Sequence, residues 1–186
     1  LIEKHNCVIT MTQAGYIKRL PSDTYSAQHR GGKGITAMTT REEDFIERIE
    51  AVYSHSNLLF FTNTGRVQSL RAFQIPEASR TAKGSNIVNI LNLASDEKVT
   101  AMISVNEFSD NEYLTMVTKQ GVIKKTLLSE YEYQRKGGKI AINLDEGDEL
   151  IFADVSKGGK DVFIATHLGR GSRYSEEDVR IVGRTS

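Results

Sequence analysis

The sequence repeats one short pattern four times, and this internal repeat restricts the folds open to the chain more than any other feature. Each copy contains an apolar stretch, a threonine, two further residues, a glycine and a second strand-like stretch. The copies cover residues 8–20, 59–70, 114–126 and 163–174, and their glycines are Gly15, Gly65, Gly121 and Gly169, spaced 50, 56 and 48 residues apart. Because glycine readily supplies the positive φ of a short turn, each copy predicts a β-hairpin.

The segments between the hairpins also favour strands. Three of them are short and rich in β-branched or aromatic residues, namely 45–53, 98–106 and 149–155. Three more follow basic loops and are expected to be extended, namely 34–39, 87–93 and 139–144. No segment sustains a 3.6-residue apolar period with caps, so we expect almost no helix.

Roughly four strands in each unit of about 50 residues predict an all-β fold, a propeller-like ring of repeated four-stranded sheets. The alternative is a β-sandwich whose hairpins resemble one another by chance. The length of 186 residues fits one domain, and 39% apolar with 26% charged residues is ordinary soluble globular composition. The first residue is Leu1 and not methionine, so we expect the chain to be part of a longer polypeptide.

The composition argues against several other classes of protein. No apolar run approaches the roughly 18–20 residues of a membrane-spanning helix, and no secretory leader opens the chain. The single cysteine, Cys7, excludes an internal disulfide and a cysteine-rich zinc site, and it suits a reducing cytoplasm. The histidines are scattered, and His5 with Cys7 gives too few ligands for a metal. No acid–base pair indicates catalysis, so we expect no catalytic residue, cofactor site or metal site.

The zero net charge of the chain conceals two oppositely charged halves. The hairpin turns and the loops that follow them hold 18 of the 24 basic residues and 7 acidic residues, a net charge of +11. The rest of the chain therefore has a net charge of −11. The windows counted as turns and loops are 13–35, 63–87, 119–142 and 167–186.

Basic residues also recur at fixed distances from the turn glycines. Fifteen residues after them come Arg30, Arg80, Lys136 and Arg184, and eighteen residues after the first three come Lys33, Lys83 and Lys139. In a ring of like units, one phase of the repeat occupies one rim, so these side chains should form a curved basic band. Such a band suits a long polyanion held along its backbone, although most single charge runs are merely solvated faces.

One loop carries a specific motif, Gln28-His29-Arg30-Gly31-Gly32-Lys33-Gly34. Adjacent glycines let backbone N–H groups converge on an anion, and the arginine and lysine add positive charge. The loop is not a Walker A motif, because Ala27 stands where the first glycine belongs and Gly34 follows the lysine. By physical reasoning alone, it is either a phosphate-contacting loop or a flexible turn.

This motif resembles the hallmark box of the DNA gyrase A C-terminal domain, which reads Q-[RK]-R-G-G-[RK]-G. Six of its seven positions match, and His29 is the exception. Residues 15–20, 59–67 and 179–184 resemble the same family, and the resemblance covers essentially the whole chain. Later repeats echo the box imperfectly at 80–84 and 135–139.

The resemblance implies a six-bladed β-pinwheel in which neighbouring blades exchange strands, with about three and a half blades present in residues 1–186 as a single, incomplete DNA-binding domain. Its rim would bind, bend and wrap duplex DNA without sequence specificity. The parent protein would be a bacterial, ATP-dependent type II topoisomerase, an isomerase that introduces negative supercoils. ATP and Mg²⁺ would be used elsewhere in a heterotetramer with the second type of gyrase polypeptide, gyrase B. The expected location is the cytoplasm, at the nucleoid.

On this reading the box, Gln28, His29, Arg30, Gly31, Gly32, Lys33 and Gly34, anchors the DNA near the start of the wrap. His29 is mostly neutral at pH 7, which affects one contact of the box. The rim that continues the path is predicted to comprise Lys18, Arg19, Arg66, Arg80, Lys83, Lys124, Lys125, Arg135, Lys136, Lys139, Arg173 and Arg184.

Three alternatives remain at this point. The related polypeptide of topoisomerase IV has similar repeats, but it lacks an intact box. A propeller that binds proteins is disfavoured by the charge pattern and by the absence of tryptophan. A ring-shaped enzyme with a central active site has no residue constellation in its favour.

Overall fold

A computed structural model describes residues 1–22, 44–132, 137–156, 161–165, 171–175 and 179–186, with backbone alone for 161–165 and 171–175. Its contacts form two compact units, residues 1–59, 69–96 and 104–106 in the first and residues 60–68, 97–103 and 107–186 in the second. Within the described residues, no helix is long and apolar enough to cross a membrane. The prediction of one domain over 1–186 stays a prediction.

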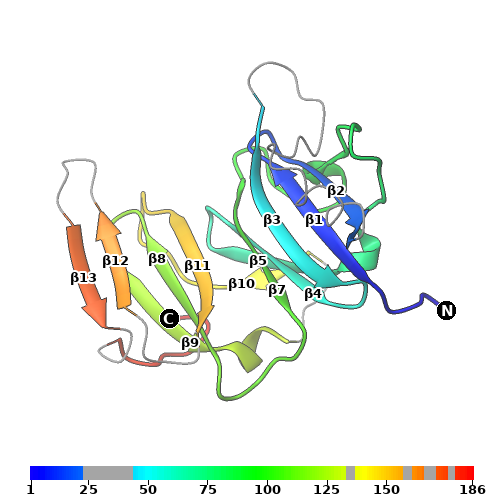
Figure 1. The fold of residues 1–186 in the computed structure, drawn as a ribbon. Helices are drawn as coiled ribbons and strands as arrows, with labels where there is room; N and C mark the ends of the chain where they lie inside the picture. The colour runs from blue at the N-terminus through cyan, green and yellow to red at the C-terminus, as the bar shows by residue number, and fades with distance from the viewer. Residues whose placement is uncertain (23–43, 133–136, 157–160, 166–170, 176–178) are drawn as a thin grey trace. The chain divides into compact units, whose positions relative to one another are not determined.

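The first unit contains a four-stranded sheet with the order β3-β1-β2-β6. Figure 1 labels β1, β2 and β3 of this sheet. Its strands are β1 (Asn6–Thr12), β2 (Tyr16–Pro21), β3 (Ile46–Tyr53) and β6 (Ser85–Asn86). β1 pairs antiparallel with both β2 and β3, which confirms the hairpin predicted at residues 8–20 and the strand predicted at 45–53 and adds the pairing between them. β6 comes from the second repeat, yet it pairs with β2 of the first, with Ile17 opposite Ser85.

A second four-stranded sheet has the order β10-β5-β4-β7 and repeats this arrangement. Its strands are β4 (Asn57–Thr62), β5 (Arg66–Arg71), β7 (Val99–Val105) and β10 (Lys139–Ile140). β10 comes from the third repeat and pairs with β5 of the second, with Val67 opposite Lys139. The second and third repeats therefore each supply a short strand to the hairpin of the repeat before them.

The remaining strands continue the series. β8 (Tyr113–Thr118), β9 (Ile123–Leu127) and β11 (Leu150–Ser156) form a sheet with the order β11-β8-β9. β12 (Asp161–Ala165) pairs antiparallel with β13 (Gly171–Ser175). The helical elements with described bounds are short 3₁₀ turns, η1 (Ala72–Gln74), η2 (Ile87–Asn89) and η3 (Leu128–Tyr131). The all-β prediction is confirmed, but the expectation that 87–93 is extended is wrong, because η2 begins directly after β6.

Three hairpin turns share one geometry. Gly15, Gly65 and Gly121 have φ of +89°, +82° and +91°. Each glycine N–H donates to the carbonyl of the threonine three residues earlier, at 3.0 Å in every case. The repeated Thr-x-x-Gly pattern is therefore the sequence signature of these turns, which confirms the hairpins predicted on them.

An acidic residue anchors each of these turns from the segment that leads into the third strand of the same sheet. The Asp44 carboxylate accepts the Ala14 N–H at 3.0 Å, and the Asp148 carboxylate accepts the Gln120 N–H at 2.9 Å. The Glu97 carboxylate instead accepts hydroxyl hydrogen bonds from Thr62 and Thr64 at 2.6 and 2.8 Å. Glu97 and Asp148 are buried, so these two carboxylates belong to the interior of the second unit and not to a solvated surface.

Asp148 also shows the electrostatic effect of this arrangement. Burial by itself raises the pKa of its carboxyl group. Hydrogen bonds from the Thr118 hydroxyl and from two backbone N–H groups outweigh burial, and the pKa lies below its ordinary value. The carboxylate is thus held ionised beside the turn.

The central strands are buried on both faces, which explains their nearly continuous apolar sequences. In the first unit, Ile9, Met11, Ile17 and Leu20 are at most 2% exposed. In the second unit, Phe60 and Phe61 are fully buried, and the Phe61 ring meets the Tyr131 ring edge-on with centroids 6.3 Å apart. These buried side chains therefore anchor the strands in the core of each unit.

Candidate nucleic-acid interface

Part of the predicted interface falls outside the described residues. This part comprises the box residues Gln28, His29, Arg30, Gly31, Gly32, Lys33 and Gly34, together with Arg135, Lys136 and the side chain of Arg173. The other predicted rim residues are described, and they fall into buried, half-buried and exposed groups.

Lys18 is fully buried, although the sequence predicts it on the rim. Its Nζ donates hydrogen bonds to the carbonyl oxygens of Ser79, Arg80 and Ala82 at 2.9, 2.8 and 2.9 Å. Burial, with a smaller contribution from the Arg80 charge, lowers the pKa of Lys18 to about 8. The ammonium is occupied by a protein loop, so the structure corrects the prediction that Lys18 contacts a polyanion.

Lys124 occupies the same place in the third repeat, three residues after the turn glycine, and is 4% exposed. Its Nζ donates to the carbonyls of Ala141 at 3.0 Å, Ser186 at 3.1 Å and Arg184. Burial lowers its pKa to about 8; Glu130 opposes this shift and Arg184 adds to it. The predicted rim role of Lys124 is corrected for the same reason.

Two lysines lie over tyrosine rings. The Nζ of Lys125 is 4.3 Å from the centroid of Tyr113, and this lysine is 5% exposed, so it too belongs to the interior and not to the predicted rim. Lys83 is exposed, and its Nζ lies 3.9 Å from the centroid of Tyr16. Cation–π contact fixes the direction of a lysine stem and leaves its charge in place. Lys83 therefore stays a candidate contact.

The remaining basic side chains are tied to backbone carbonyls near the surface. Arg19 Nε donates to Ile75 O at 3.0 Å, and Arg66 Nη2 donates to Gly137 O at 2.5 Å. Arg184 Nη1 donates to Ile140 O at 2.5 Å. A guanidinium has five N–H donors, so one such bond orients the group without exhausting its capacity for an anion. Arg66 is exposed, whereas Arg19 and Arg184 are half-buried.

Lys139 differs from Lys83 in its structural place, although both follow their turn glycine by eighteen residues. Lys139 lies on β10 opposite Val67, and its Nζ donates to Glu130 O at 2.9 Å. The corresponding position in the second repeat is Ser85 on β6, opposite Ile17. The third repeat therefore reaches its exchanged strand two residues sooner, and the eighteen-residue register does not mark one structural position.

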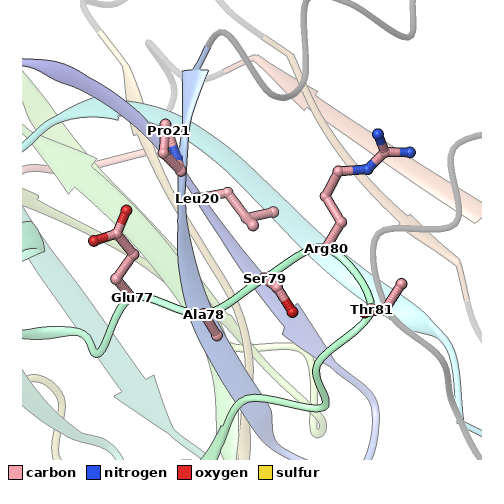
Figure 2. A pocket seen from close by; sticks show the side chains of 7 residues that line it. All are labelled: Leu20, Pro21, Glu77, Ala78, Ser79, Arg80 and Thr81. Atoms are coloured by element: carbon pink, nitrogen blue, oxygen red, sulfur yellow. The ribbon is translucent and has the colours of Figure 1, made fainter.

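Segment 77–81 and the end of β2 line an open depression of about 730 Å³ in the first unit (Figure 2). Glu77 forms a parallel bridge with Arg19, which sets this segment beside β2. The same bridge recurs in the second unit between Lys125 and Ile181. In Figure 2 the side chains of Glu77 and Arg80 extend in different directions from the segment. Arg80 Nε is buried and lacks a hydrogen-bond partner among the described residues.

No group of three or more histidine, cysteine, aspartate or glutamate side chains suited to a metal lies within the described part of the chain. The described part of the site is a set of basic residues whose loops are held by contacts to backbone carbonyls. Its chemistry is that of holding anions, since the donors are guanidinium, ammonium and backbone N–H groups.

Comparison with known proteins links these loops to a family. The model of the DNA gyrase C-terminal domain, a beta-propeller, matches the chain in four consecutive stretches, residues 8–52, 56–106, 112–157 and 160–186. The A subunit of DNA gyrase from Clostridium acetobutylicum is 52% identical over all 186 residues, which correspond to 22% of that protein. The chain thus spans about a fifth of the length of the curated relative that it matches.

Two solved structures share the fold. The C-terminal domain of DNA topoisomerase IV is 27% identical with a TM-score of 0.85, over 100% of this chain and 56% of the other. The DNA gyrase A C-terminal domain is 24% identical with a TM-score of 0.69, over 97% of this chain and 58% of the other. The four matched stretches follow the four hairpin repeats and the strands that they exchange. The chain belongs to the DNA gyrase C-terminal domain family.

Proposed function

We propose that this chain binds duplex DNA through the phosphate backbone, without reading sequence, and bends the duplex along its basic loops. The observation that carries the proposal is the support of equivalent loops in two repeats. A half-buried arginine, Arg80 or Arg184, lies fifteen residues after the turn glycine, and its own carbonyl is bound by a buried lysine of the preceding repeat. Loops fixed in this way present positive charge at repeated positions.

The proposed contact set differs from the one predicted from sequence. Lys18, Lys124 and Lys125 leave it because they are buried. The described members are Arg19, Arg66, Arg80, Lys83, Lys139 and Arg184. The box at 28–34, with Arg135, Lys136 and Arg173, completes the proposal outside the described side chains. Phosphate contacts of this kind position DNA but carry no sequence information.

Bending sets a lower limit on the number of contacts. Curving 20–30 base pairs by 40–90° costs roughly 1–6 kcal/mol. One loop is too small to offset this cost, whereas several charged loops in series are sufficient. In the whole protein, the bent segment would form a wrap with a defined crossing sign, and ATP hydrolysis by the gyrase B partner would convert that wrap into negative supercoils. ATP, Mg²⁺ and DNA cleavage belong to other parts of that complex, at the nucleoid of a bacterial cell.

The test is the salt dependence of binding to plain duplex DNA. Each phosphate neutralised adds about 0.9 to the slope of log affinity against log salt, so a band of several contacts gives a steep line. Arg66→Glu, which changes an exposed residue of the contact set, should weaken binding to all sequences alike. Lys98→Glu, the same charge reversal at an exposed lysine outside the set, is the control. If the chain shows no salt-sensitive binding to plain duplex DNA, a protein-binding propeller becomes the favoured alternative.

A second candidate is the corresponding polypeptide of topoisomerase IV, because its solved domain superposes with a TM-score of 0.85. The 52% identity to a gyrase protein and the nearly intact box favour gyrase. Wrapping of relaxed circular DNA separates the two, since the proposal requires writhe to be trapped when nicks are sealed.

A further inference from the structure

Two buried lysines hold the backbone of a neighbouring repeat in the same way. Lys18 and Lys124 each lie three residues after a turn glycine. Lys18 binds carbonyls that lie fourteen, fifteen and seventeen residues after Gly65. Two of the carbonyls bound by Lys124 lie fifteen and seventeen residues after Gly169. The ammonium of one repeat thus meets the same stretch of backbone in the next repeat, in both units.

We propose that Lys18 and Lys124 are positioning residues, whose ammonium groups fix the basic loops of the following repeats and thereby set where Arg80 and Arg184 meet DNA. We call the two contacts ammonium clamps. The inference rests on the proposed function for its DNA-binding consequence. Its structural half, the local hold on the loops, stands on the hydrogen bonds alone.

The donor count explains why lysine suits this place. An ammonium has three N–H donors and no acceptor, and three carbonyl oxygens surround each Nζ. A buried carbonyl without a donor is costly, so removing the ammonium exposes the loop to rearrangement. At the equivalent place in the second repeat stands Gln68, also buried, and a Cβ on Gly138 would come within 2.6 Å of its Cγ. The residue three positions after the turn glycine therefore lies against the loop of the following repeat in each of these three repeats, and it is a lysine in two of them.

Burial, more than the charges around each clamp, decides how it responds to pH. Arg80 faces Lys18, while Glu130 and Arg184 face Lys124. Neutral pH keeps both groups mostly as ammonium. In an open loop the ammonium would be solvated and its pKa would return toward the ordinary 10.5, so the closed loop binds fewer protons between about pH 8 and 10.5. Raising the pH through this range therefore favours the closed loop, while the neighbouring arginines keep their charge.

The experiment uses the full chain with Lys18→Met and Lys124→Met combined, since methionine keeps most of the stem and removes the ammonium. Amide hydrogen exchange is followed at Ala78, Ala82, Val182 and Ser186, whose N–H groups bond within or beside the clamped loops. Exchange there should accelerate while the turn amides of Gly15 and Gly121 stay protected. DNA affinity at pH 7 should fall about tenfold, or 1.4 kcal/mol. Lys98→Met, which also removes one positive charge, should change affinity much less.

The pH profile separates positioning from simple packing. The protection of the clamped amides, corrected for the intrinsic exchange rate, should rise in the wild-type chain between about pH 7.5 and 9.5, and it should show no such rise in the double variant. Unchanged or uniformly faster exchange in the variant would overturn the clamps. If the loops of the double variant exchange faster but this variant binds DNA as tightly as Lys98→Met does, the role of the clamps in DNA binding is overturned. If the wild-type chain itself shows no salt-dependent binding, the proposed function fails, and the exchange data still decide the structural half.

Discussion

At the scale of single residues, several charged side chains of this chain are buried and bind backbone or hydroxyl groups of the protein instead of solvent or an anion. A lysine in a basic stretch ordinarily indicates a solvated or anion-binding face. Lys18 and Lys124 instead lie in the interior, where carbonyl oxygens replace water as partners. Glu97 and Asp148 show the same for acids, because hairpin turns supply their hydrogen bonds. Charged side chains of both signs thus hold turns and loops in place.

The buried lysines predict how stability depends on pH. Their pKa is about 8 in the folded chain, against 10.5 ordinarily, so the unfolded chain binds more protons between these values. Their contribution to the free energy of unfolding should therefore rise as the pH increases from about 8 to 10.5. Urea unfolding at about pH 7.5 and 9.5 measures this rise, and the Lys18→Met, Lys124→Met variant should lack it. An equal rise in the variant would assign the effect to other groups.

The acidic anchors predict a second residue-scale effect. Asp148→Ala leaves the Gln120 and Glu149 N–H groups without their carboxylate partner and should destabilise the chain by about 1–3 kcal/mol. Because the pKa of Asp148 lies below its ordinary value, its stabilisation is complete above that value and is lost as the pH falls through the lowered pKa. Asp145→Ala, at an exposed neighbour, is the control. Equal thermal midpoints for the two variants would contradict the anchor.

At the scale of elements, the exchanged strands connect one repeat to the next. β6 pairs with β2 and β10 pairs with β5, and each short strand follows a glycine packed against the strand that it joins. Gly84 has φ of +91°, and a Cβ there would lie 2.6 Å from Ile17 O. The approach of two backbones, together with the turn, excludes a side chain at this place.

Two glycine substitutions separate the requirement for a positive φ from the requirement for close backbone approach. Gly84 and Gly121 both have φ of +91°, but a Cβ at Gly121 would meet no atom within 4 Å. Gly121→Ala should cost about 1–2 kcal/mol from the left-handed backbone alone. Gly84→Ala should cost more, because the β2–β6 pairing must shift as well. Thermal unfolding of both variants tests this order, and equal losses would show that the backbone conformation alone is limiting.

At the scale of the whole molecule, the proposed function depends on charged loops acting in series along one duplex. Arg30→Ala with Lys33→Ala should abolish the writhe trapped on relaxed circular DNA and leave part of the linear DNA affinity, because the other loops remain. Topoisomer distribution after nick sealing is the measurement for the first effect and gel shift for the second. Retained writhe in this variant would show that the box is dispensable for the wrap.

The sequence alone was sufficient for the fold class and for the hairpins. Thr-x-x-Gly at four places, with apolar stretches on both sides, predicts the turns because few residues other than glycine adopt φ near +90°. The family resemblance likewise depended on contiguous residues, chiefly 28–34. Local patterns of this kind need no knowledge of distant contacts.

Only the tertiary structure decided which basic residues are buried and which strands are exchanged. Lys18 and Lys83 look alike in the sequence, but a loop from the next repeat covers the first, whereas the second stays exposed. The eighteen-residue spacing that placed Lys139 with Lys83 was misleading for a related reason. The pairing of Lys139 with Val67 decides where this lysine lies, and its distance from Gly121 along the chain does not. Burial and strand partners are set by contacts between residues 60 to 74 positions apart, and one repeat read by itself does not contain them.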